Sequence, residues 1–182
     1  MHQDIKEIFV TEEEIVEITK KLGKQIEKDY KDKKPIFLGL LNGAVPFFAE
    51  LTKRVNIMAE FDFMQVKSYV GTQSLGVVNI IKDMSHDPKD RHIIIVEDII
   101  DTGYTLALVV EALKKRGAAS VEVATLLDKP EGRKDSSVNP KYIGHIIENQ
   151  FVVGFGLDYN GYYRNLPYVG ILKESVYKKN SN

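Results

Sequence analysis

The sequence predicts an α/β fold in which helices cover a mostly parallel sheet. Residues 35–41 form an uninterrupted apolar run of strand length, and strands rich in aliphatic residues are also expected at 92–98 and 120–129. Such runs are typical of strands that are buried on both faces. Segments with apolar residues at helical spacing separate these runs. Because strands and helices alternate along the chain, the strands are expected to run parallel, with crossover helices between them.

The N-terminal part of the chain begins with a helix that is expected to run to about Tyr30. Thr11 followed by Glu14 matches a capping box, in which two side chains satisfy free backbone N–H groups. One face of this helix carries Ile15, Ile18, Leu22 and Ile26. The strand at 35–41 follows, and the short helix after it, residues 46–55, starts with a proline, which is tolerated in a first turn.

The rest of the chain supplies further strands and one clear helix. Residues 60–69 alternate between apolar and polar, and residues 76–83 form another strand-like run. The apolar run that ends at residue 98 leads into a helix, and Gly117 stands where its C-terminal cap belongs. The apolar face of that helix consists of Leu106, Val109, Val110 and Leu113. Residues 150–157 are expected to form the last strand.

The composition is that of one globular domain. A length of 182 residues fits one domain, and 43% hydrophobic with 28% charged residues suits a packed core and a solvated surface. The net charge of −1 gives no general attraction to nucleic acid or to an anionic membrane, so neither is expected as a partner.

Cysteine is absent, which excludes disulfides and thiolate metal sites and makes the cytoplasm the expected compartment. The first residues are too acidic and polar for a signal peptide. No apolar run approaches the ~20 residues of a membrane-spanning helix.

Four loops are expected beyond the carboxyl ends of the sheet strands, where ligands of such folds bind. They follow Leu41, Val96, Leu127 and Val153. The candidate functional residues are therefore sought there.

One of these loops lies within IIIVEDIIDTGYTL, residues 93–106. Backbone N–H groups at a helix start are unpaired, and the helix dipole favours an anion there. Thr102 and Thr105 add hydroxyl donors, and Gly103 allows a phosphate to approach closely. The pattern indicates a phosphate site, although an ordinary helix start capped by an Asp or Thr side chain would have the same letters.

Two carboxylates, Glu97 and Asp98, come at the end of the buried strand before this turn. Unpaired carboxylates are costly in such a place. A phosphorylated sugar with Mg²⁺ would place its phosphate on the turn and its hydroxyls and metal on the acids. The alternative is that surface lysines pair with the acids. The P-loop and dinucleotide motifs are absent, and the four histidines show no metal-ligand spacing.

Five segments spanning residues 35–172 form one set: LLNGA, KSYVGTQS, VEDIIDTGYTL, LLDK and FVVGFGLDYNGYYRNLPYVG. In this order they resemble the pyrophosphate loop, the start of the mobile lid, the ribosyl-diphosphate signature, the purine-selecting lysine and the C-terminal base-and-metal segment of the hypoxanthine-guanine phosphoribosyltransferases. These belong to the purine/pyrimidine phosphoribosyltransferase family.

The resemblance implies a type I phosphoribosyltransferase fold, with a parallel core sheet and a small hood built from terminal segments. It implies one domain, residues 1–182, with its core at about residues 35–150 and its hood formed by the N-terminal segment and about residues 151–182. The implied reaction transfers ribose 5-phosphate from 5-phosphoribosyl-1-diphosphate to N9 of hypoxanthine, and of guanine, giving IMP or GMP and pyrophosphate in purine salvage. A homo-oligomer, a dimer or tetramer, is also implied.

The resemblance gives each matching residue a role. Glu97 and Asp98 would bind the ribose hydroxyls and Mg²⁺, and Asp158 would help to hold a second Mg²⁺. Asp101 would be the general acid/base near N7 of the purine. The 5-phosphate would lie on Asp101, Thr102, Gly103, Tyr104 and Thr105. Pyrophosphate would meet Leu41, Asn42, Gly43, Ser68, Tyr69 and Arg164.

The chemistry suits these roles. Breaking the anomeric bond builds positive character on the sugar and negative charge on pyrophosphate, which Mg²⁺ and positioned donors stabilise. A carboxylate at Asp101 that shares its proton with a purine nitrogen would contribute roughly 10²–10⁴-fold. A helix cap is the alternative role for Asp101.

The purine site is expected at Lys129, Phe151, Val152 and Asp158. The Lys129 ammonium suits a 6-oxo group and not a 6-amino group. Phe151 would stack on the base, and backbone groups near Val152 and Asp158 would contact its edge. The alternatives are a solvated charge at Lys129 and a core position for Phe151.

The segment SYVGTQSLG, residues 68–76, is expected to close over the site and exclude water; a surface loop is the alternative. In some family members the loop at residues 41–43 contains a non-proline cis peptide. Asn42 and Tyr104 stand where some relatives have basic residues, which bears on the strength of donor binding and not on the reaction.

Two other functions fit the same fold. One is a non-catalytic, nucleotide-sensing regulator, and the other is an enzyme that prefers xanthine. A general acid/base at Asp101 speaks against a sensor, and the lack of a basic surplus speaks against RNA binding.

Overall fold

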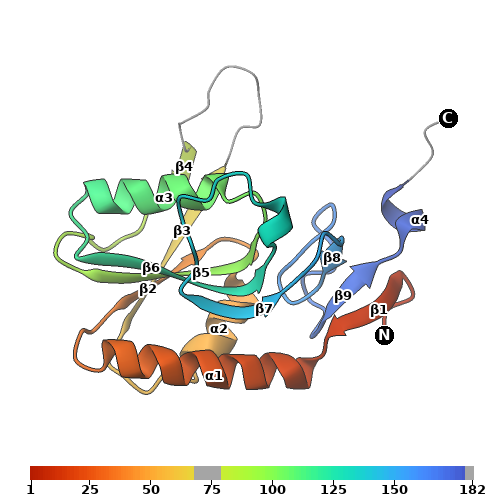
Figure 1. Ribbon diagram of the computed structural model, residues 1–182, viewed down its shortest axis with the longest axis horizontal. Coiled ribbons are helices and arrows are strands. Elements are labelled where there is room, and N and C mark those ends of the chain that lie inside the picture. The colour runs from red at the N-terminus through yellow and green to blue at the C-terminus, as the bar shows by residue number, and fades with distance from the viewer. Residues whose placement is uncertain (68–78, 179–182) are drawn as a thin grey trace.

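The computed structural model describes residues 1–67 and 79–178 and shows an α/β fold with two sheets (Figure 1). In chain order the elements are β1 (Ile5–Val10), α1 (Glu12–Tyr30), β2 (Ile36–Leu40), α2 (Val45–Thr52), β3 (Glu60–Lys67), β4 (Asn79–Lys82), β5 (His92–Ile100), α3 (Tyr104–Lys115), β6 (Ser120–Asp128), a 3₁₀ turn (Pro130–Gly132), β7 (Tyr142–Ile146), β8 (Val152–Val153), β9 (Val169–Leu172) and α4 (Glu174–Tyr177).

The larger sheet has the strand order β4-β3-β2-β5-β6-β7. Strands β3, β2, β5, β6 and β7 pair in parallel, and β4 pairs antiparallel with β3 at one edge. The predicted α/β class with a mostly parallel sheet is confirmed.

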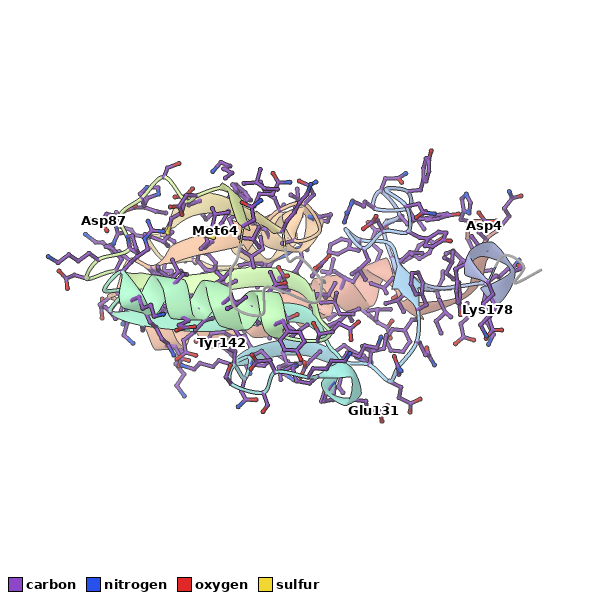
Figure 2. The ribbon with its side chains drawn as sticks, turned by 90° about the horizontal axis from the view of Figure 1, so that it is seen from above. Asp4, Met64, Asp87, Glu131, Tyr142 and Lys178 are labelled. Atoms are coloured by element: carbon purple, nitrogen blue, oxygen red, sulfur yellow. The ribbon has the colours of Figure 1, made fainter. Side chains whose placement is uncertain are left out.

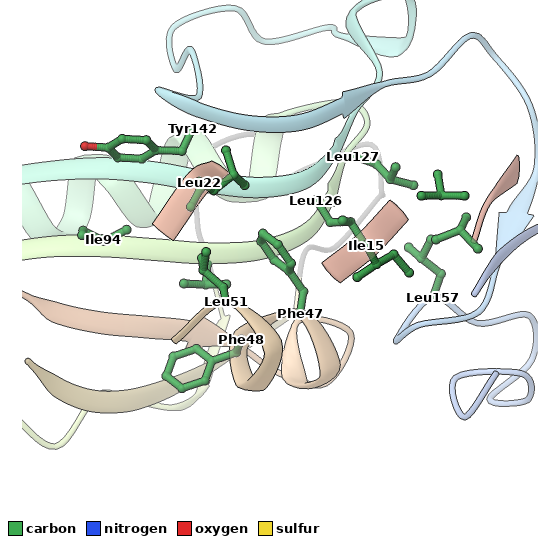
Figure 3. Close-up of a cluster of buried hydrophobic side chains, with 14 of the residues drawn as sticks. Ile15, Leu22, Phe47, Phe48, Leu51, Ile94, Leu126, Leu127, Tyr142 and Leu157 are labelled. Atoms are coloured by element: carbon green, nitrogen blue, oxygen red, sulfur yellow. The ribbon is translucent and has the colours of Figure 1, made fainter. Parts of the chain in front are cut away.

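Helices cover both faces of this sheet: α3 lies on one face, and α1 and α2 lie on the other (Figure 1). Successive side chains of a strand point to opposite faces, so β5 serves both layers. Ile93 and Ile95 pack in the apolar cluster that includes α3. Ile94 and Val96 pack in the cluster that includes α1 and α2, part of which Figure 3 shows. Burial on both faces explains the uninterrupted apolar run.

The start of α1 is closed by its own side chains, as the sequence predicts. The Thr11 hydroxyl accepts a hydrogen bond from the Glu14 N–H (3.2 Å), and the Glu14 carboxylate accepts one from the Thr11 N–H (2.8 Å). Three glutamates in the first turn also complement the helix dipole. This helix end has no need of a ligand.

The two ends of the chain meet in the small sheet, whose order is β1-β9-β8. Both outer strands pair antiparallel with β9, and the Tyr163 hydroxyl donates to the Asp4 carboxylate (2.7 Å). Figure 2 shows Asp4 and Lys178 at one end of the molecule and Asp87 at the opposite end. The small sheet thus forms a cap at one end of the core.

The sequence prediction misses three strands and misplaces one. β1, β7 and β9 are short, and pairing with distant segments fixes them. The strand predicted at 150–157 is reduced to β8, because the backbone turns at Gly154 (φ 98°) and Gly156 (φ 102°). The prediction that the loop after Val153 follows a strand of the parallel sheet is wrong, since β8 belongs to the small sheet.

Residues 68–78, which contain the predicted lid and the start of the predicted strand at 76–83, lie outside the described residues. Within the described part of the chain, no helix combines the length and apolar character needed to cross a membrane.

Candidate active site

β5 carries the two predicted carboxylates, Glu97 and Asp98, into the site. The sequence analysis placed them at the end of the strand, whereas β5 continues to Ile100 because its last residues pair with the end of β6. On its other side, β5 pairs with β2 only as far as Val96. Both acids therefore lie in a stretch of β5 that extends beyond the residues that pair with β2.

The side chains of Glu97 and Asp98 point to opposite faces of the sheet, as successive strand residues do. Glu97 lines a pocket on the face that carries α3, and Asp98 lies against Gly43 on the face that carries α2. A ligand that contacts both acids would have to lie across the end of the sheet.

Glu97 has a buried carboxylate oxygen, Oε2, with no hydrogen-bond partner among the described residues. Burial raises the pKa of Glu97 well above its ordinary value, and the neighbouring Asp98 raises it further. Neither acid forms an ion pair within the described residues, so the alternative of pairing with surface lysines is wrong for this part of the chain. An unpartnered buried oxygen is costly, and a ligand hydroxyl or a cation would satisfy it.

Asp98 is held between the sheet and the turn after β2. Burial raises its pKa to about 6, against the opposing effect of the Ile99 N–H, which donates to its carboxylate at 2.9 Å. The Arg164 guanidinium lowers the pKa and the Asp158 carboxylate raises it. A Cβ atom at Gly43 would collide with the Asp98 carboxylate, so the close approach requires glycine.

The N-terminus of α3 is open. Gly103 occupies the N-cap position with φ 82°, and no side chain of residues 1–67 or 79–178 caps the helix. The alternative that Asp101 or Thr102 is an ordinary helix cap is therefore wrong. The first turn contains no acidic side chain, in contrast to α1. Its backbone N–H groups are available to an anion, which the helix dipole also favours.

A pocket of about 150 Å³ lies at this turn. It brings together five of the predicted residues, Glu97, Asp101, Thr102, Gly103 and Thr105. A larger pocket of about 360 Å³ lies beside α1 and has an acidic polar lining. The smaller pocket is the candidate site, because a phosphate requires donors.

Asp101, which lines the pocket, lies close to Lys129. The Lys129 Nζ lies 3.7 Å from an Asp101 carboxylate oxygen and donates to the Gln150 carbonyl at 3.5 Å. Lys129 is 8% exposed, so the alternative of a solvated charge at the strand end is wrong. A buried ammonium needs polar partners, and a carbonyl group on a ligand would supply another.

The turn Leu41–Gly43 joins β2 to α2, and its Leu41–Asn42 peptide bond is cis. The Leu41 N–H donates to the Met64 carbonyl (2.9 Å). The next two N–H groups, of Asn42 and Gly43, donate to no backbone carbonyl within the described residues. Adjacent amides of this kind suit an anion.

The loop after β8 returns to the same turn. Gly156 packs so closely on the Gly43 carbonyl that it has no space for a side chain. Arg164 pairs with Asp158 at 2.6 Å and donates to the Gly156 carbonyl. Two predicted residues, Asp158 and Arg164, are thereby brought beside the turn from a distant part of the chain.

Phe151 is 40% exposed, so the alternative of a core position is wrong. Its ring stacks on Tyr177 of α4 (centroids 4.9 Å apart, planes at 23°) and meets the edge of Tyr159. Val152, the next residue, is buried in β8. The aromatic face predicted for the purine is held by the C-terminal helix.

The structure leaves some predicted residues apart from this arrangement. Ser68 and Tyr69 lie outside the described residues. Tyr104 is 43% exposed and does not line the pocket. The sequence analysis also missed Asp128 and Arg133, which form a buried ion pair beside the turn of α3. An arginine four residues after a strand-end lysine gave no recognisable signal.

The carboxylates of the site suit a divalent cation that takes its remaining oxygen ligands from a bound substrate. Among the described residues, no group of three potential metal-binding side chains is close enough to hold an ion. Mg²⁺ is commonly bound by one or two carboxylates together with substrate phosphates. Buried Glu97 and Asp98 supply such carboxylates, and both oxygens of Asp158 already accept bonds from Arg164 and the Gly161 N–H.

An open helix N-terminus, available turn amides and buried carboxylates lie together at the carboxyl end of a parallel sheet, and their chemistry suits a phosphorylated sugar. The comparisons with known proteins identify the family. Residues 5–160 match the phosphoribosyl transferase domain family, and the chain belongs to this family.

Relatives and solved structures match nearly the whole chain. Hypoxanthine-guanine phosphoribosyltransferase of Streptococcus pneumoniae (strain ATCC BAA-255 / R6) is 53% identical over 97% of this chain and 98% of that protein. The protein of the same name from Lactococcus lactis subsp. lactis is 54% identical over 96% and 95%. A crystal structure of a hypoxanthine phosphoribosyltransferase from Staphylococcus aureus has a TM-score of 0.93 and 47% identity, over 97% and 96% of the two chains.

Proposed function

We propose that this protein transfers the 5-phosphoribosyl group of 5-phosphoribosyl-1-diphosphate to N9 of hypoxanthine and of guanine, giving IMP or GMP and pyrophosphate. The observation that carries the proposal is the pocket that joins a helix start and a buried Glu97 oxygen, neither of which has a side-chain partner in the described part of the chain. The activities named for the close relatives support it.

The donor would bind along the carboxyl end of the sheet. Its 5-phosphate would accept hydrogen bonds from the amides and hydroxyls of the turn 101–105. Its ribose hydroxyls would donate to Glu97, and its pyrophosphate would lie on the amides of Asn42 and Gly43. Such a pose lets one molecule reach both faces of β5.

The base would lie between Lys129 and Phe151. The Lys129 ammonium would donate to the 6-oxo group, which replaces water as a partner for a buried charge. Asp101, 3.7 Å from that ammonium, would exchange a proton with N7 as N9 attacks the anomeric carbon. A base with a 6-amino group would present a donor to a donor, so adenine would be rejected.

Mg²⁺ is the cofactor of the proposal, and Glu97, Asp98 and Asp158 are the residues that would hold it. When bound, it would neutralise charge on the departing pyrophosphate. Asp98 has a second task without metal: it fills the space that Gly43 leaves open and so supports the turn whose amides face the pyrophosphate.

Nucleotide formation with five bases tests the proposal. Protein, donor and Mg²⁺ are incubated with hypoxanthine, guanine, xanthine, adenine or uracil, and the product is separated by chromatography. We expect IMP and GMP, and little product from adenine and uracil. Xanthosine monophosphate as the main product would move the assignment to a xanthine enzyme, and no product from any base would favour a nucleotide-sensing regulator.

Two further features belong to the proposal. The protein would act in the cytoplasm, as the absence of cysteine suggests. It would also form a dimer or tetramer, since Val45, Met58 and Phe61 are large apolar side chains that are 44–73% exposed. Light scattering coupled to size-exclusion chromatography measures the mass in solution, and a mass of one chain of 20.6 kDa would contradict the oligomer.

A further inference from the structure

The phosphate-binding turn and the base-binding lysine are joined by a second turn, residues 129–135. The Lys129 N–H donates to the Ile100 carbonyl (3.0 Å). The N–H groups of Lys134 and Asp135 both donate to the Thr102 carbonyl (3.0 Å each). The turn therefore begins on β5 and ends on the phosphate-binding turn, and its geometry sets the distance between the two parts of the site.

The Arg133 side chain lies inside this arrangement. Its guanidinium pairs with Asp128, the residue before Lys129, and donates to the Val138 carbonyl at 3.2 Å. The side chains of Arg133 and Asp128 are only 9% and 10% exposed. A Cβ atom at Gly103 would lie 2.8 Å from the Arg133 Cδ, so the arginine stem packs directly behind the phosphate-binding turn.

Stability alone gives a poor account of this pair. Buried ion pairs are often no more stabilising than apolar residues of the same volume. The Arg133 Nε is also buried without a hydrogen-bond partner among the described residues, which adds a desolvation cost. What the pair provides is a fixed distance: Asp128 fixes the strand end that carries Lys129, and the arginine stem fixes Gly103.

We propose that Arg133 is a positioning residue that holds the phosphate-binding turn 101–103 and Lys129 at a fixed distance from each other, through its ion pair with Asp128 and its packing on Gly103. The inference rests on the proposed function, because this distance matters only if one reaction uses both the phosphate-binding turn and Lys129. Since a misplacement of about 1 Å can lower the rate of catalysis roughly 100-fold, a change in this distance should be measurable in the kinetics.

Three variants test the inference. Arg133→Met keeps an unbranched stem behind Gly103 but removes the charge. Arg133→Met with Asp128→Asn removes both charges, so no buried carboxylate is left unpaired and the protein folds even if the single variant does not. Arg116→Met is the matched control, because Arg116 pairs with Asp83 (2.9 Å) on an exposed part of the surface.

The measured quantities are a KM and a ratio of two kcat/KM values, which do not depend on the amount of folded protein. In both Arg133 variants we expect the KM for the ribosyl diphosphate to rise about 10-fold or more, and the ratio of kcat/KM for hypoxanthine to that for adenine to fall by a similar factor. Arg116→Met should leave both values unchanged. If the double variant keeps the KM and the base ratio of the unmodified protein, Arg133 is purely structural and the inference is wrong.

Hydrogen exchange separates this inference from the proposed function. We expect the amides of Lys134 and Asp135 to exchange at least about 10-fold faster in the double variant, while amides of α1 keep their rates. If the unmodified protein forms no nucleotide with any base, the proposed function fails. The exchange rates still decide whether Arg133 and Asp128 hold the second turn in place. Unchanged rates at Lys134 and Asp135 would overturn the inference by themselves.

Discussion

At the scale of single residues, the site contains buried polar groups whose burial costs free energy when no ligand is bound. Glu97 has a buried oxygen without a partner among the described residues, Asp98 has a raised pKa, and Lys129 is buried against one carboxylate and one carbonyl. Each of these features lowers the stability of the ligand-free protein. A bound sugar phosphate would satisfy the two acids and a bound base would satisfy Lys129, so the same features favour binding.

The first prediction concerns Asp98 and pH. Because burial raises its folded-state pKa from 3.8 to about 6, the folded protein keeps a proton that the unfolded chain has lost between these values. The free energy of unfolding therefore falls as the pH rises through this window. Asp98→Asn removes the effect, so near pH 8 we expect the variant to be more stable than the unmodified protein by roughly 2–3 kcal/mol.

Urea unfolding near pH 8 and near pH 4 measures this difference. At the lower pH the Asp98 carboxyl is protonated when folded, and we expect the two proteins to have similar stabilities. Asp32→Asn, at an exposed position after α1, should show no difference at either pH. A gain at both values would mean that packing, and not ionisation, separates the two proteins.

The second prediction concerns Asp101. Asp101→Asn keeps the size of the side chain but removes the proton acceptor, so we expect kcat to fall roughly 10²–10⁴-fold while the dissociation constant of the donor changes little. Rapid-quench kinetics and calorimetric titration measure the two quantities. Asp87→Asn, which Figure 2 shows at the end of the molecule opposite to Asp4 and Lys178, is the control. An equal loss in both quantities would make Asp101 a binding residue only.

At the scale of elements, α1 and α3 show how a helix start is either closed or kept for a ligand. α1 has a capping box and acidic residues in its first turn. α3 has neither, and its N-cap is a glycine with φ 82°. The packing of residues 129–135 against this glycine holds the open turn in shape.

The third prediction compares two glycines with the same backbone conformation. Gly103 has φ 82° and Gly161 has φ 83°, so alanine is strained at both positions to a similar degree. A Cβ atom at Gly103 would lie 2.6 Å from the Asp135 carbonyl, whereas one at Gly161 would meet no described residue within 4 Å. We expect Gly103→Ala to lower the free energy of unfolding by roughly 1–3 kcal/mol more than Gly161→Ala.

Chemical denaturation of both variants measures this difference. Gly103→Ala should also weaken donor binding, because the Cβ atom pushes the phosphate-binding turn away from residues 129–135. Equal losses of stability in the two variants would show that the second turn gives way, and would argue against a rigid connection between the two parts of the site.

At the scale of the whole molecule, the proposed function predicts that ligand binding and folding are linked through the metal. The described residues contain no complete metal site, so Mg²⁺ alone should bind weakly. The fourth prediction is that Mg²⁺ raises the unfolding temperature substantially only when the ribosyl diphosphate is present. Donor at about 100 times its dissociation constant should then add about 2.7 kcal/mol to the free energy of unfolding.

Differential scanning calorimetry with Mg²⁺, with donor, with both, and with both plus EDTA measures this linkage. Near pH 5 the joint effect should shrink, because Asp98, with a pKa of about 6, must lose its proton before it can take part in metal binding. A full effect of Mg²⁺ without the donor would mean that the protein forms a metal site by itself.

Local sequence is sufficient to predict the strand, turn and start of helix between Ile93 and Leu106. These residues are contiguous, and both the apolar run and the hydroxyl-rich turn act within a few residues. The capping box of α1 is predicted for the same reason. The sequence also indicates a turn at Gly103, because glycine readily adopts a positive φ such as the 82° found there.

Only the tertiary structure brings Gly43 against Asp98, Gly156 against Gly43, and Arg133 between Asp128 and Gly103. It also buries Lys129, for which the residues alone left a solvated charge as an alternative, and pairs β1 with β9 from opposite ends of the chain. Such contacts depend on how remote segments pack. The sequence by itself therefore determined which chemical groups the site contains, and the packing decided how they face one another.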